Sequence, residues 1–98
     1  MSVYAVTRHQ GALDWLEQEG VHYDEHILHL NVNQVKPGDT VIGNLPIPMV
    51  AELNEKGVAY LHLSFTVPFE KRGFELSARQ LREMGISLQA FEVKRSDF

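Results

Sequence analysis

The chain contains 98 residues and no cysteine, and its formal net charge is -4 at pH 7; this length predicts one domain over residues 1–98. The lack of cysteine excludes disulfides and thiolate-bound zinc or iron–sulfur sites, and the acidic balance excludes a broad binding surface for duplex nucleic acid. No apolar run approaches the roughly 20 residues that cross a bilayer, and no signal-peptide pattern opens the chain, so we expect a cytoplasmic protein without a membrane partner.

The first third of the chain predicts a strand, a helix and a second strand. Val3–Thr7 is β-branched, aromatic and uncharged, which predicts a short buried strand. Ala12–Glu19 carries apolar residues on one helical face, and Gly20 is a natural stop for that helix. Tyr23–Leu30 is more polar, so we expect a strand nearer a sheet edge. Asn31–Asp39 is a connection with a Pro-Gly-Asp turn signal.

The middle of the chain predicts two strands separated by a helix. Thr40–Ile42 reads as a short strand, and Leu45–Lys56 includes a helix that ends at Gly57. Tyr60–Phe65 is the clearest strand of the chain, and a long loop, Thr66–Leu76, follows it.

The last part of the chain predicts a capped helix and a final strand. Ser77 caps the helix, Gln80 completes a capping box, and Gly85 ends the helix. Leu88–Val93 alternates apolar and polar residues, as a strand with one solvated face does. We expect the tail, Lys94–Phe98, to be frayed.

The element order β-α-β-β-α-β-α-β predicts the α/β fold class. Helical crossovers favour a mostly parallel sheet of about five strands with helices on its faces, a Rossmann-like three-layer arrangement. Three turns then follow strand carboxyl ends, where open α/β sheets bind ligands. If the strands lie side by side, the turns converge on one crevice: Arg8–Gly11, Gly43–Pro46 and Ser64–Thr66.

A cation and an imidazole lie together at the first turn from strand to helix. Arg8 offers a planar fork that bonds phosphate oxygens in pairs, and His9 can move a proton near neutral pH. The helix that follows adds free N–H groups and a positive dipole end. The turn therefore indicates an anion site, most simply for a phosphate. The alternative is an exposed basic residue beside a histidine that caps the helix.

Two later turns carry further candidate ligand-binding residues. Gly43 permits close backbone approach, and Asn44 can cap the helix or bind a ligand; a plain helix start is the alternative. Ser64 ends a strand, and Lys71 and Arg72 follow in the long loop, so hydroxyl and basic groups suited to a phosphodiester gather there. A solvated charge cluster is the alternative for these residues.

The long loop is also unusually apolar. Such a loop tends to pack on its own core or on a second subunit. Its apolar side chains are Phe65, Val67, Phe69 and Phe74.

Three histidines, His22, His26 and His29, have the spacing of metal ligands if the segment is a helix. On the strand predicted here, His22 and His26 share a face and His29 points the other way. We therefore interpret them as polar strand residues, with a cation site completed by Asp24 and Glu25 as the alternative.

Several blocks of the chain resemble the small stand-alone Csx-type CRISPR-associated proteins of type III systems. The blocks are VTRHQGALDWL, PGDTVIGNLP, YLHLSF and RGFELSARQL, which together extend over most of the chain. The resemblance implies a CARF-related domain that binds cyclic oligoadenylate messengers across a homodimer interface. It implies a ring nuclease that degrades the messenger, expected to be cyclic tetra-adenylate, and switches off the antiviral response.

The chemistry of such a ligand needs little more than positioning and charge. A free 2′-hydroxyl held in line can attack the adjacent phosphorus and leave a 2′,3′-cyclic phosphate end. We expect Arg8 and His9 to be catalytic, with no cofactor and no metal. A binding protein without catalysis and a phosphoesterase for another small nucleotide remain as alternatives. The expected ligand-binding residues are Thr7, Gly11, Gly43, Asn44, Ser64, Lys71 and Arg72.

Overall fold

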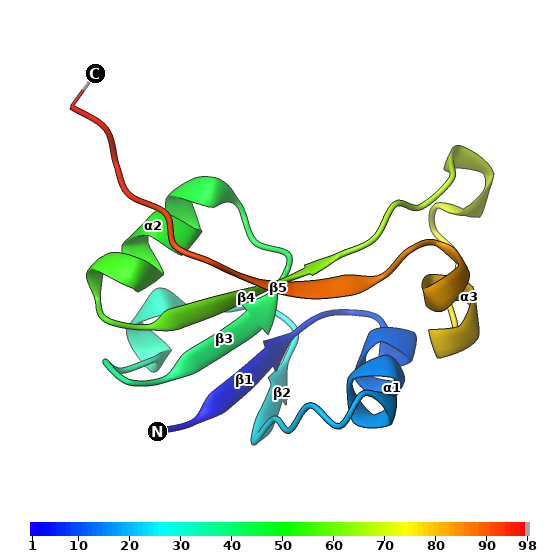
Figure 1. Cartoon of the computed structure of the whole chain (residues 1–98), viewed down its shortest axis with the longest axis horizontal. Helices are drawn as coiled ribbons and strands as arrows, with labels where there is room; N and C mark the ends of the chain where they lie inside the picture. The colour runs from blue at the N-terminus through cyan, green and yellow to red at the C-terminus, as the bar shows by residue number, and fades with distance from the viewer. Residues whose placement is uncertain (98) are drawn as a thin grey trace.

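A computed structural model describes residues 1–97, which form an α/β fold around one mixed sheet (Figure 1). The strands follow the spatial order β2-β1-β3-β4-β5. The first four in the chain are parallel, and β5 is antiparallel to β4. The prediction of a mostly parallel sheet with helices on its faces is therefore confirmed. The strands are β1 (Val3–Val6), β2 (Glu25–Ile27), β3 (Thr40–Gly43), β4 (Ala59–Ser64) and β5 (Ser87–Phe91).

The helices lie on both faces of the sheet because successive strand side chains point to opposite faces. Ala5 and Ile42 join a buried cluster with α1 (Gln10–Gln18) and α3 (Ala78–Glu83). Val6 and Val41 join a second cluster on the side of α2 (Ile47–Glu55). Figure 1 shows α1 and α3 side by side, away from α2. Within residues 1–97, no helix has both the length and the apolar character to cross a membrane.

Local sequence signals determine several element ends. The side chain of Ser77 accepts a hydrogen bond from Gln80 N and the Gln80 side chain bonds Ser77 N, so the predicted capping box is confirmed. Gly20 and Gly85 follow α1 and α3 with φ of 74° and 78°, in the left-handed region that stops a helix.

Two strands end two or more residues before their predicted ends because their neighbours limit them, whereas the ends of the other three differ from prediction by one residue. β2 pairs only with the four-residue β1, so it ends at Ile27 instead of continuing to Leu30. β5 ends at Phe91 because Val93 N donates to Asn54 Oδ1 at 2.7 Å, which directs the chain to α2. Two 3₁₀ turns were not predicted, η1 (Val32–Gln34) and η2 (Phe69–Lys71).

One residue of the tail contacts the fold, whereas the expected fraying of the rest of the tail stays a prediction. Arg95 Nε lies 3.1 Å from both carboxylate oxygens of Glu55 on α2. Phe98, the last residue of the expected frayed segment, lies outside the described residues.

Asp39 fastens the beginning of β3 to two other segments. Its buried carboxylate accepts hydrogen bonds from Ser2 N and Lys36 N, both at 2.9 Å. These backbone donors, Ser2 first, hold the pKa of Asp39 below its usual range. The charged form therefore stabilises the fold above the unfolded pKa of about 3.9, and this contribution is lost as the pH falls through the lower folded pKa.

Asp39→Asn is expected to lower the free energy of unfolding at pH 7, and the deficit relative to the parent should shrink below about pH 4. Urea titrations of the variant and the parent at a series of pH values measure this deficit in the free energy of unfolding. Asp97→Asn, at an exposed tail position, is the matched control. A deficit that stays constant down to acid pH would show that the charge of Asp39 is not involved.

Candidate functional site

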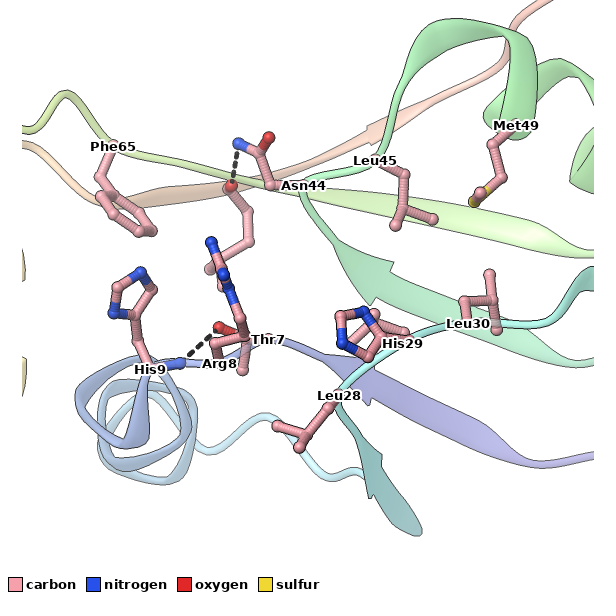
Figure 2. Close-up of a pocket in the computed structure, with 12 residues that line it drawn as sticks. Thr7, Arg8, His9, Leu28, His29, Leu30, Asn44, Leu45, Met49 and Phe65 are labelled. Atoms are coloured by element: carbon pink, nitrogen blue, oxygen red, sulfur yellow. Dashed lines mark hydrogen bonds between the residues drawn. The ribbon is translucent and has the colours of Figure 1, made fainter. Parts of the chain in front are cut away.

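The carboxyl ends of β1, β2, β3 and β4 surround a pocket of about 530 Å³, here called the first hollow (Figure 2). Because β1, β3 and β4 are neighbours and parallel, the residues after each strand meet at one edge. The predicted convergence of three turns on one crevice is confirmed, because residues of Arg8–Gly11, Gly43–Pro46 and Ser64–Thr66 all line this pocket. Apolar side chains from α2 and the segment after β2 form the remaining wall. The polar and aromatic side chains of the lining are Thr7, Arg8, His9, His29, Asn44 and Phe65.

The backbone of His9 is the N-cap of α1, and its imidazole lines the pocket. Its carbonyl accepts from Ala12 N at 3.1 Å, whereas its side chain makes no capping hydrogen bond. The alternative of a histidine that caps the helix is therefore confirmed for the backbone of His9, while its side chain takes no part in the cap. The ring lies edge-to-face on Phe65 with centroids 5.8 Å apart, as Figure 2 shows. The backbone N–H of His9 donates to Thr7 Oγ1 at 3.2 Å, which holds the turn.

Arg8 enters the first hollow as an uncompensated cation. Its side chain is exposed and forms no ion pair within residues 1–97, where every ion pair involves other residues. Figure 2 shows the side chain extending into the hollow beside His9. A guanidinium in this position can bind a phosphate with two parallel hydrogen bonds.

The Asn44 side chain forms a hydrogen bond to β4, and the residues on either side of Asn44 are held by Tyr60. Its Nδ2 donates to Leu63 O at 3.1 Å, the dashed line to the Asn44 amide in Figure 2. The Tyr60 hydroxyl donates to Gly43 O at 2.9 Å and accepts from Leu45 N at 3.0 Å. Burial raises the pKa of Tyr60 and keeps this phenol protonated. The turn around Asn44 is thus fixed on both sides.

His62 completes the support beneath this turn. Its Nδ1 lies 2.7 Å from the Tyr60 hydroxyl, and its ring packs edge-to-face on Phe91 at 5.8 Å. The Tyr60 hydroxyl thus links the ring of His62 to the turn at Gly43 and Leu45.

His29 is a pocket residue that the sequence interpretation missed. The predicted strand extended to Leu30, but β2 ends at Ile27, so His29 follows the strand and lines the first hollow. His26 instead contacts Thr7 O through Nε2 at 2.7 Å, and His22 contacts Asp24 at 2.9 Å. The shortness of the first strand was the signal that β2 ends early, because a parallel partner cannot pair beyond the end of its neighbour. Among residues 1–97, no three His, Asp or Glu side chains gather in a way that would hold a metal ion.

A second hollow of about 750 Å³ adjoins the first and shares Arg8, His9 and Phe65 with it. Its other wall is the loop that follows β4. Lys71 and Arg72 line this second hollow, so the structure brings these predicted residues close to Arg8.

Three predicted ligand-binding residues line neither hollow. Gly11 is buried, and a Cβ there would lie 1.9 Å from Leu76 O, so its position serves the packing of α1 on the start of α3. Gly43 is buried at the end of β3, where a Cβ would lie 3.1 Å from Val6 O. Ser64 is exposed opposite Ser87 of β5.

One comparison with known proteins finds a match. Residues 4–94 match the family model described as "Putative CRISPR-associated protein (Cas_VVA1548)". Neither the curated proteins nor the solved structures give a significant match to the chain.

Proposed function

Because the chain belongs to this family of CRISPR-associated proteins, we propose that it is a ring nuclease with a CARF-like domain that cleaves cyclic oligoadenylate and ends type III CRISPR signalling. The observation that carries the proposal is a group of cations without carboxylate partners at one edge of an acidic protein. Arg8, Lys71 and Arg72 line the two adjoining hollows and form no ion pair within residues 1–97. Cyclic tetra-adenylate is the expected substrate.

The proposed reaction is an in-line transesterification. The 2′-oxygen of one ribose forms a bond to the adjacent phosphorus while the bond from phosphorus to the 5′-oxygen breaks. The proton of the 2′-hydroxyl passes to a base, and an acid donates a proton to the 5′-oxygen. The products are a 2′,3′-cyclic phosphate end and a 5′-hydroxyl end, and no water is consumed.

The first hollow supplies a group for each part of this reaction. Arg8 stabilises the charge that develops on the phosphoryl oxygens. His9 donates the proton to the leaving oxygen, and His29, which lines the same hollow, takes the proton of the 2′-hydroxyl. Asn44 orients the phosphate from its fixed turn. Two imidazoles allow the acid and the base to act in one step.

A homodimer with the ring on its two-fold axis would double this set of groups. Two exposed apolar side chains, one of them in the lining of the first hollow, are surfaces that such a dimer could bury. Leu28, which lines the first hollow, is 57% exposed, and Ile47 at the start of α2 is 70% exposed. The symmetric ring and the symmetric pair of sites would then match.

Incubation of the protein with labelled cyclic tetra-adenylate is expected to yield linear products that end in a 2′,3′-cyclic phosphate. The reaction should persist in a chelator, since the proposed groups are an arginine and two imidazoles. Light scattering at micromolar concentration should show a dimer.

Other outcomes of this incubation would change the assignment. Unchanged ring bound in stoichiometric amount would make the chain a binding protein without catalysis. Activity that disappears in chelator and returns with manganese would replace the metal-free mechanism. A protein that neither binds nor cleaves the ring would end the proposal.

A further inference from the structure

The second hollow is a separate compartment that opens beside the catalytic groups. It shares Arg8, His9 and Phe65 with the first hollow and continues along the loop after β4. Its volume of about 750 Å³ lies within the common range of small-molecule sites. A ligand centred on Arg8 can therefore extend into it.

Phe74 presents an aromatic surface to this compartment. Its side chain is 66% exposed, yet it lines the second hollow. Phe65 and Val67 from the same loop also line this hollow, but both are partly buried against the core. Phe69 is 84% exposed and lines neither hollow. The loop thus holds Phe65 and the more exposed Phe74 at the hollow and Phe69 outside it.

The charge of the second hollow favours an anion. Arg8, Lys71 and Arg72 line it, and Glu75 is the one carboxylate in its lining. By contrast, Arg79, Arg82 and Arg95 each pair with a glutamate elsewhere. Cations without partners next to an aromatic face are the combination that binds single-stranded nucleotides, because bases stack on the ring and phosphates bind the cations.

We propose that the second hollow is a purine-base subsite in which Phe74 stacks on an adenine while Lys71 and Arg72 bind the phosphate beside it. The inference rests on the proposed function and deepens it, since it assigns base recognition to the loop and phosphate chemistry to the first hollow. A nucleotide seated this way places its neighbouring phosphate near Arg8 and His9, which line both hollows.

The test compares Phe74→Ala with Phe69→Ala, its matched control in the same loop. The probes are tetra-deoxyadenylate, which has no 2′-hydroxyl and cannot be cleaved by this mechanism, and the same tetramer without bases. Phe74→Ala should raise the Kd for tetra-deoxyadenylate by about 5- to 150-fold. It should leave the Kd for the base-free tetramer unchanged. Phe69→Ala should change neither.

A second readout follows the aromatic ring itself. Phe74→Trp should keep the affinity for tetra-deoxyadenylate, and binding should quench the added indole fluorescence. Phe69→Trp should show no such quenching. Lys71→Ala should weaken both tetramers, because a phosphate contact does not depend on the base.

Distinct outcomes overturn the subsite and the nuclease. An unchanged Kd in Phe74→Ala, or equal losses for both tetramers, overturns the subsite, even if the parent cleaves cyclic tetra-adenylate. Failure of the parent to bind tetra-deoxyadenylate overturns it too. If light scattering shows that Phe74→Ala is a monomer whereas the parent is a dimer, the Phe74 side chain is a subunit contact and the subsite is wrong. If Phe74→Ala loses affinity only for the tetramer that carries bases, while the parent does not cleave cyclic tetra-adenylate, the subsite is supported and only the nuclease assignment is overturned.

Discussion

His9→Ala is expected to slow single-turnover cleavage of cyclic tetra-adenylate by about 10²–10⁴-fold, the usual contribution of a positioned acid or base. The imidazole lines both hollows and makes no capping bond, so its removal leaves the turn intact. The Kd for the ring should change less than tenfold, which corresponds to about 1.4 kcal/mol. Rate and affinity therefore separate in this variant.

Arg8→Ala should behave differently in the same assays. The guanidinium attracts the phosphate before reaction and stabilises the added charge during it, so both affinity and rate should fall. His22→Ala is the matched control, because His22 contacts Asp24 and lines neither hollow. It should cleave at the parent rate. If His9→Ala also cleaves at the parent rate, the role of proton donor passes to the Lys71–Arg72 segment.

Gly11→Ala is expected to destabilise the fold by about 3 kcal/mol, at the upper end of the usual cost of overpacking. An alanine within a helix normally stabilises relative to glycine by about 1 kcal/mol. Here the new Cβ would lie 1.9 Å from Leu76 O and 2.7 Å from Ser77 C, both backbone atoms. Since backbone cannot move aside as a flexible side chain can, α1 and α3 must separate.

Urea denaturation of Gly11→Ala against the parent measures this loss. Glu17→Ala, at an exposed position of the same helix, should stay within about 0.5 kcal/mol of the parent. A Gly11→Ala protein as stable as the parent would mean that the two helices can separate without cost. Because Arg8 and His9 precede α1 directly, the variant should also lose affinity for the ring.

The sequence by itself determined the order of the elements along the chain and the mostly parallel character of the sheet, whereas the strand order in the sheet and the antiparallel β5 came from the tertiary structure. Apolar β-branched strands joined by helices can bury both faces only in a mostly parallel sheet, and such a sheet gathers its carboxyl ends at one edge. Arg8, His9 and Asn44 follow strand ends, so their meeting at the first hollow was predictable. The Ser77–Gln80 cap was predictable too, since it depends on residues three positions apart.

Only the tertiary structure decided which individual side chains reach the site. His29 joined the first hollow because the length of β2 depends on its partner β1, not on its own residues. Ser64 lies outside both hollows, whereas its neighbours Leu63 and Phe65 line the first, because adjacent strand residues point to opposite faces. Gly11 became a packing residue because Leu76, distant in sequence, lies against it. The positions of His29 and Gly11 depend on contacts between segments far apart along the chain, which local patterns do not encode.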